Sequence, residues 1–124
     1  MSLQILVVEN HGDTRRALTG LLGHFGHSIS AADTVESGKA FVRAKQFDAI
    51  VSDVGLPDGR GEDVIREAKR RQRLTAIALT SGDKVEQLND AREFDWYLRK
   101  PVDFAQLRQV LGQIASVHSG STNS

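Results

Sequence analysis

The stretch "DAIVSDVGLPDG", residues 48–59, decides the fold, because it joins a buried strand to a turn through a single acid. Residues 49–52 are apolar or small, which is the pattern of a strand buried on both faces. The residues after Asp53 are turn formers: Gly55, Pro57, Asp58 and Gly59. The strand therefore carries a carboxylate out of the core and ends there.

The composition fits one ordinary globular domain. The chain has 124 residues, with 16 basic and 16 acidic side chains, so no overall field favours nucleic acid or an anionic membrane. Cysteine is absent, which excludes disulfides and thiolate chemistry. No long apolar span or signal peptide stands out, so we expect a cytoplasmic protein without membrane contact.

The apolar pattern alternates between strand and helix along the whole chain. Strands are predicted at residues 5–8, 28–32, 49–52, 75–80 and 96–99. A helical period follows each of them, and the helix around residues 85–88 has the weakest pattern. This alternation predicts a single α/β domain with a doubly wound, flavodoxin-like parallel sheet of five strands. We expect the strand order 2-1-3-4-5, with helices on both faces.

The ends of two helices and of the chain carry recognisable signals. Asp13 or Thr14 is predicted to cap the first helix, in which Arg15 is placed to face water, and Asp103 is predicted to cap the last helix. Residues 117–124 are small and polar, so we expect a flexible tail there.

Polar side chains stand at the end of four predicted strands. Ligands of such sheets bind at the carboxyl ends of the strands, where these residues would meet. Carboxylates suit a hard cation such as Mg²⁺, a lysine and a hydroxyl suit phosphoryl oxygens, and an aspartate forms acyl phosphates. The strand ends are Glu9-Asn10, Asp53, Thr80-Ser81 and Lys100-Pro101. The sequence therefore predicts a phosphoryl site with Asp53 as acceptor.

Four motifs resemble the receiver domain of two-component response regulators. They are "VVEN" (7–10), "SDVGLPDGRG" (52–61), "ALTS" (78–81) and "YLRKPVD" (97–103). The resemblance covers residues 4–116. The sequences of the four motifs are most similar to those of the C-terminal receivers of hybrid sensor histidine kinases. It implies a phospho-accepting domain of a two-component system or phosphorelay, which is a signal-transduction phosphoprotein and not an enzyme.

The resemblance also implies a mechanism, which is Mg²⁺-dependent transfer of a phosphoryl group from a kinase phosphohistidine to Asp53. The implied oxygen donors to Mg²⁺ are Glu9, Asn10, Asp53 and the backbone carbonyl of Gly55. The implied switch residues are Thr80, Lys100 and Tyr97. The implied partners are a sensor histidine kinase or phosphotransfer protein and a downstream protein or neighbouring domain, with the chain a monomer or weak homodimer.

Two departures from the family keep alternatives open. Asn10 stands where the family has a second acid, so weaker Mg²⁺ binding is expected, and a phosphorylation-independent pseudo-receiver that binds other proteins is the alternative function. The segment between Thr80 and Lys100 is short for the family, so the fourth helix should be short or shifted. Tyr97 is equally consistent with a fixed, half-buried aromatic residue.

Other functions fit the residues less well. A phosphatase that uses an aspartyl phosphate would need a second acid at the position of Gly55. An FMN carrier would need a phosphate-binding loop where "ENHGDT" (9–14) places two acids. The basic stretch "REAKRRQR" (66–73) is typical of a solvated helix face rather than a nucleic-acid site, and His11 is expected to be a surface residue.

Overall fold

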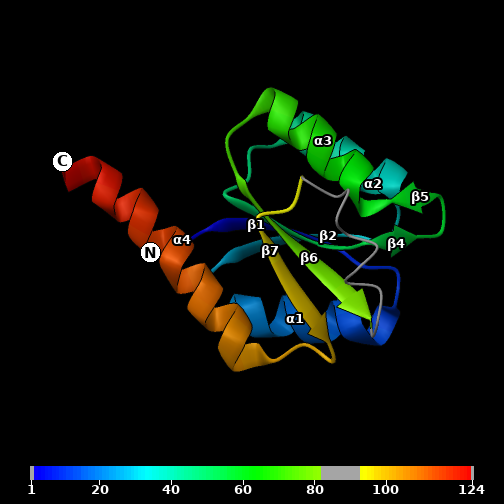
Figure 1. Ribbon diagram of the computed structural model, residues 1–124, viewed down its shortest axis with the longest axis horizontal. Coiled ribbons are helices and arrows are strands. Elements are labelled where there is room, and N and C mark those ends of the chain that lie inside the picture. The colour runs from blue at the N-terminus through cyan, green and yellow to red at the C-terminus, as the bar shows by residue number, and fades with distance from the viewer. Residues whose placement is uncertain (1, 82–92, 124) are drawn as a thin grey trace.

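A five-stranded parallel sheet forms the centre of the computed structural model, which describes residues 2–81 and 93–123 (Figure 1). Its order is β2-β1-β3-β6-β7. These strands are β1 (Gln4–Val8), β2 (Ser28–Ala32), β3 (Ala49–Asp53), β6 (Thr75–Ser81) and β7 (Trp96–Lys100). Two short strands that were not predicted, β4 (Gly55–Leu56) and β5 (Gly59–Arg60), form an antiparallel pair. Without this pair, the observed order is the predicted 2-1-3-4-5, so the fold class is confirmed.

The helices cover both faces of the sheet. They are α1 (Gly12–His24), α2 (Val35–Ala44), α3 (Gly61–Arg71) and α4 (Phe104–Asn123). α1 and α4 lie on one face, and α2 and α3 lie on the other (Figure 1). A hydrophobic core lies on each face of the sheet, and successive residues of β1 pack into the two cores alternately. Ile5 and Val7 pack with α1 and α4, and Leu6 and Val8 pack with α2 and α3. The apolar run is continuous because both faces of the strand are buried.

The start of α1 differs from the prediction. The helix begins at Gly12 and has no side-chain cap, so the expectation that Asp13 or Thr14 would cap it was wrong. The physical reason is that the N–H of Arg15 already bonds to the carbonyl of His11, which places Asp13 inside the first turn. There, Asp13 pairs with Arg16 on the exposed face.

The last helix is capped as predicted. Asp103 Oδ1 accepts hydrogen bonds from the N–H groups of Ala105 and Gln106 at 2.9 and 3.2 Å. α4 then continues to Asn123, so it passes through most of the segment expected as a polar tail, and its last turns project away from the sheet (Figure 1). The predicted helix around residues 85–88 lies outside the described residues. Within residues 2–81 and 93–123, none of the helices combines the length and the hydropathy that a membrane span requires.

Candidate functional site

Three charged side chains, which stand at or just after the ends of three strands, meet at the carboxyl edge of the sheet. Lys100 Nζ lies 2.6 Å from Asp53 Oδ1 and 2.7 Å from Glu9 Oε1. The parallel register explains this meeting, because it pairs Val8 with Ser52, and the residues that follow them, Glu9 and Asp53, carry their carboxylates to the same edge. The structure thus brings together three of the residues that the sequence placed at strand ends.

Glu9 is the most buried member of this group. Its exposed fraction is 0%, and only its Oε1 oxygen is bonded, to Lys100. Its Oε2 oxygen is buried and has no hydrogen-bond partner among the described residues. A buried carboxylate oxygen in this state is costly unless a further donor or cation binds it. The site therefore has an unused ligand atom beside Asp53, which is itself 7% exposed.

A second unused polar atom is the hydroxyl of Thr80, near the end of β6. Thr80 is 2% exposed, and its Oγ1 has no hydrogen-bond partner in the described part of the chain. Its strand lies between β3 and β7, which carry Asp53 and Lys100. The hydroxyl is thus available as a donor to a group that enters the site.

The loop after β1 places Asn10 at the surface. Asn10 is exposed, and Arg15 Nη1 donates to the backbone carbonyls of Glu9 and Asn10 at 2.9 and 3.4 Å. The expectation that Arg15 faces water was incomplete, because its side chain folds back onto this loop. Gly55, the other implied donor, is also exposed. Among residues 2–81 and 93–123, no group of three His, Cys, Asp or Glu side chains could hold a metal ion.

Tyr97 lies at the surface beside Phe94. The phenol ring is 6.2 Å from the Phe94 ring between centroids, and the residue is 40% exposed. Partial burial raises the pKa of Tyr97 above its ordinary value, and the negative charges of Glu62 and Asp95 raise it further. Tyr97 is therefore within the electrostatic reach of Glu62 in α3, the helix that follows the loop after Asp53 (residues 54–60).

Gly61 is a site residue that the sequence analysis missed. A Cβ at this position would fall 2.0 Å from the carbonyl oxygen of Asp53 and 2.6 Å from Ser52 Oγ. The N–H of Gly61 donates to the carbonyl of Val54 at 2.9 Å. The chain therefore returns to the backbone of Asp53 as α3 begins, and only glycine allows this approach.

The loop after Asp53 is also fixed to α2 through Asp58. Its carboxylate accepts from the N–H groups of Val35 and Glu36 at 2.7 and 3.1 Å, at the start of that helix. These hydrogen bonds, led by the one from Val35, lower the pKa of Asp58. The acid that follows Pro57 thus anchors the hairpin of β4 and β5, and does not add charge to the site.

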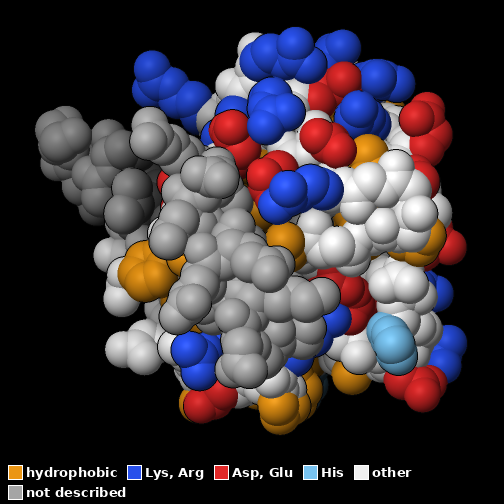
Figure 2. Space-filling model, turned by 45° about the vertical axis from the view of Figure 1, so that its right-hand side comes forward, with side chains coloured by type: hydrophobic (Ala, Val, Ile, Leu, Met, Phe, Trp, Pro, Cys, Tyr) orange, Lys and Arg blue, Asp and Glu red, His pale blue; other side chains and the backbone are white. Residues whose placement is uncertain are grey.

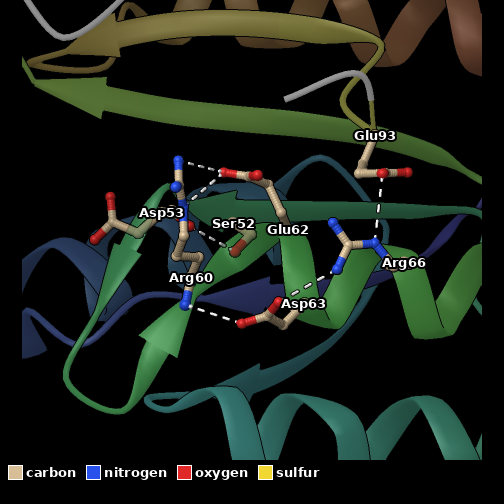
Figure 3. A network of polar contacts seen from close by, with 7 residues as sticks. All are labelled: Ser52, Asp53, Arg60, Glu62, Asp63, Arg66 and Glu93. Carbon is tan, nitrogen blue, oxygen red and sulfur yellow. Dashed lines mark hydrogen bonds and ion pairs between the residues drawn. The ribbon is translucent and has the colours of Figure 1, made fainter. Parts of the chain in front are cut away.

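An ion pair stands at the junction of β5 and α3. Arg60 Nε and Nη2 lie 3.1 and 3.0 Å from Glu62 Oε1 (Figure 3). The Glu62 side chain is 9% exposed, while that of Arg60 is 58% exposed. The backbone N–H of Arg60 also donates to Asp63, which pairs with Arg66 (Figure 3). The sequence offered no signal for the burial of Glu62, because acids are ordinary in the first turn of a helix.

The basic stretch of α3 is partly compensated by neighbouring acids. Lys and Arg side chains gather at the top of Figure 2, over the layer of α2 and α3, with acidic side chains between them. The ion pairs of this stretch include Arg66–Asp63, Arg66–Glu93, Lys69–Asp95 and Arg71–Glu67. The cations of these pairs are partly or largely exposed, which is typical of a solvated face.

Comparison with known proteins identifies the fold and its family. The family model described as "Response regulator receiver domain" matches residues 5–112. The chain is 30% identical to the KDP operon transcriptional regulatory protein KdpE of Escherichia coli K12 over 95% of this chain and 53% of that protein. It is also 30% identical to the response regulator protein PilR of Pseudomonas aeruginosa, over 86% of this chain and 24% of that protein. The chain thus spans about half or less of these relatives.

A solved structure supports the same assignment. The CheY-like receiver domain from Methylobacillus flagellatus superposes with a TM-score of 0.82 at 25% identity, covering 92% of this chain and 99% of that one. The receiver domain of the sensor histidine kinase PA1611 from Pseudomonas aeruginosa PAO1 has the same fold, with a TM-score of 0.81 at 23% identity over 93% and 99% of the chains. The order of the sheet, the site at its carboxyl edge and the family match agree: this chain belongs to the response regulator receiver domain family.

Proposed function

We propose that this receiver accepts a phosphoryl group on Asp53 and uses it to change a protein-interaction face. The observation that carries the proposal is the position of Lys100 Nζ, 2.6 Å from Asp53 Oδ1, beside the unpartnered hydroxyl of Thr80. A cation and a hydroxyl donor thus flank a carboxylate at the edge of the sheet. Phosphoryl transfer depends mainly on positioning and charge stabilisation, which these groups supply.

The reaction replaces one bond to phosphorus by another. A carboxylate oxygen of Asp53 attacks the phosphorus of a phosphohistidine on a partner kinase or phosphotransfer protein, and an O–P bond forms as the N–P bond breaks. The departing imidazole keeps the electron pair of the broken bond and takes up a proton from solvent. Lys100 offsets the charge that the acceptor gains, and later attack by water on the acyl phosphate would reset the domain.

The donor atoms of this site fit a magnesium ion. The free Oε2 of Glu9, the carboxylate of Asp53, the amide oxygen of Asn10 and the carbonyl of Gly55 are all oxygen ligands, which Mg²⁺ prefers. A bound Mg²⁺ would neutralise part of the charge between donor and acceptor. The PA1611 receiver is described with a magnesium ion coordinated in its active-site cleft, which supports the proposal by analogy.

The phosphoryl group would then bias the domain between two states. Thr80 would donate its unused hydroxyl to a phosphoryl oxygen, and Tyr97, at the surface of β7, would respond to this movement. A downstream protein or a neighbouring domain would recognise the face around β7. We place this exchange in the cytoplasm, with the chain acting as a monomer or weak homodimer.

One observation favours a second function, a pseudo-receiver that binds partners without phosphorylation. Asn10 removes one negative charge, so Glu9 and Asp53 are the two carboxylates of the site, and Lys100 already bridges them. The single ammonium group leaves one net negative charge among these three groups, so the site attracts Mg²⁺ less strongly than it would with a second acid at position 10. The two functions differ in whether Asp53 takes up phosphate.

Mass spectrometry after incubation with a small acyl phosphate and Mg²⁺ decides between them. The expected result is one added phosphoryl group in the natural chain, none in Asp53→Asn, and one in Asp58→Asn, a matched acid of the same loop whose role is to anchor α2. Equal labelling of Asp53→Asn would overturn the proposed acceptor. A natural chain that stays unlabelled at saturating donor and Mg²⁺ would favour the pseudo-receiver.

A further inference from the structure

Arg60 is a second cation at the acceptor loop, and its bonding is incomplete. Its Nε and Nη2 both point at a single oxygen, Glu62 Oε1 (Figure 3). A guanidinium pairs best with a carboxylate through two parallel bonds to two oxygens. The pair between Arg43 and Glu67 has this better form, with Nε 2.7 Å from Oε2 and Nη2 3.1 Å from Oε1. The chain therefore offers a poorly formed pair and a matched, well-formed pair.

The two partners differ in their freedom to move. The side chain of Glu62 is 9% exposed and is fixed in the first turn of α3, whereas that of Arg60 is 58% exposed. An exposed guanidinium loses little packing when it turns toward another anion. Glu62, in contrast, stays in place as a buried carboxylate. The arrangement thus holds an exposed cation by one oxygen of a buried acid.

Arg60 lies within reach of the acceptor. The next residue, Gly61, packs against the backbone of Asp53, since its Cβ would fall 2.0 Å from the Asp53 carbonyl oxygen. Neighbouring Cα atoms are about 3.8 Å apart, so the backbone of Arg60 is also close to Asp53. In the view of Figure 3, the guanidinium group of Arg60 is seen between the side chains of Asp53 and Glu62.

We propose that Arg60 binds the phosphoryl group on Asp53, leaving Glu62 when that group arrives. This inference rests on the proposed function, because it needs phosphorylation of Asp53. The phosphoryl group would offer Arg60 roughly two negative charges and three acceptor oxygens. Glu62 offers one negative charge and binds Arg60 through one oxygen. Lys100 is already shared between Glu9 and Asp53, so a further cation beside Lys100 and Mg²⁺ would help to balance the larger charge.

The movement of Arg60 has a consequence at β7. Once Arg60 leaves, the charge of Glu62 is uncompensated, and this charge is one of the causes, after burial, that raise the pKa of Tyr97 in β7. The proposal therefore links the phosphoryl group to the surface of β7 through α3, by a route separate from Thr80. Tyr97 is the only tyrosine of the chain, so its titration can be followed in the whole protein.

The test measures binding of beryllium fluoride, a phosphoryl analogue, with Mg²⁺ present. Arg60→Gln is expected to bind it about tenfold more weakly than the natural chain, Arg60→Lys to an intermediate degree, and Arg43→Gln as tightly as the natural chain. In nitrogen NMR spectra of the natural chain, the Nε signal of Arg60 should shift on binding while that of Arg43 stays. This second measurement needs no variant and so does not depend on the folding of Arg60→Gln.

The outcomes separate this inference from the proposed function. Tight analogue binding with an unchanged Arg60 signal and an unaffected Arg60→Gln variant would overturn the role of Arg60 and leave Asp53 as acceptor. Absence of both analogue binding and phosphorylation in the natural chain would overturn the proposed function, and the role of Arg60 with it.

Discussion

The carbonyl oxygen of Asp53 occupies the space that a side chain on Gly61 would need, because a Cβ there would lie 2.0 Å from it. Gly61→Ala should therefore force the acceptor loop apart and lower the free energy of unfolding by about 3 kcal/mol, the upper part of the usual range for overpacking. Urea denaturation measures this change. Gly20→Ala is the control, since no atom lies within 4 Å of a Cβ at Gly20 and alanine should raise stability by about 0.5 kcal/mol. Equal midpoints for the two variants would contradict the packing argument.

Lys100 should stabilise the fold as well as the acceptor. Lys100→Met leaves Glu9, which is 0% exposed, as a buried charge without its cation, so we expect a loss of about 3 kcal/mol in the free energy of unfolding. Glu9→Gln in the same chain should recover much of this loss, because the remaining group is neutral. A double-mutant cycle by urea denaturation gives the coupling. Strictly additive effects would show that Lys100 and Glu9 do not interact.

Thr80→Val should raise the stability of the fold and weaken the response to beryllium fluoride. The hydroxyl of Thr80 is buried without a partner among the described residues, so valine should raise the free energy of unfolding by about 1 kcal/mol. The stabilisation that beryllium fluoride gives to the natural chain should shrink in this variant, since the hydroxyl can no longer donate. Thermal unfolding with and without the analogue measures both quantities, with Thr80→Ser as control. A destabilised Thr80→Val with a full analogue response would refute the proposed role.

His27 should make the fold sensitive to acid. Burial, followed by the positive amino terminus, lowers the pKa of His27 below 6.5. Its Nδ1 accepts from the N–H of Leu3 at 3.0 Å, a bond that requires the neutral ring. The unfolded chain binds a proton more readily, so stability is full above pH 6.5 and falls as the pH drops through the pKa of the folded state. Urea denaturation at about pH 8 and about pH 5 measures the loss.

Variants at His27 and at the nearby His24 provide the controls for this pH dependence. His27→Gln keeps an acceptor without a titrating ring, so the stability of this variant should vary less between the two pH values. His24 is exposed, and His24→Gln should retain the dependence of the natural chain. A His27→Gln variant with an unchanged pH dependence would assign the acid sensitivity to other groups.

The strands and their ends were predictable because each rests on local signals. Continuous apolar runs mark strands that are buried on both faces, and parallel pairing forces their carboxyl ends to one edge. Glu9, Asp53 and Lys100 could therefore be grouped from the amino-acid sequence alone. Their distances could not, because the length of each side chain and its rotamer depend on the packed neighbours.

The parts that escaped prediction depend on contacts between distant segments. Asp58 is a turn former by sequence, but its partner is the N–H of Val35, 23 positions away. Arg15 has the periodicity of an exposed helix residue, yet it reaches the carbonyl of Glu9. Gly61 looks like a simple helix start until the backbone of Asp53 is placed against it. In each case, a contact with another segment of the folded chain decides the role of the residue.

The contact between Lys100 and Glu9 joins positions 91 residues apart, and this separation sets the order in which the site is completed during synthesis. A ribosome makes Glu9 first, Asp53 next and Lys100 last. Before β7 is made, the two acids lack the ammonium group that lies between them in the folded chain. Two acids without a cation would repel another anion, so the proposed phosphoryl transfer would require the final strand.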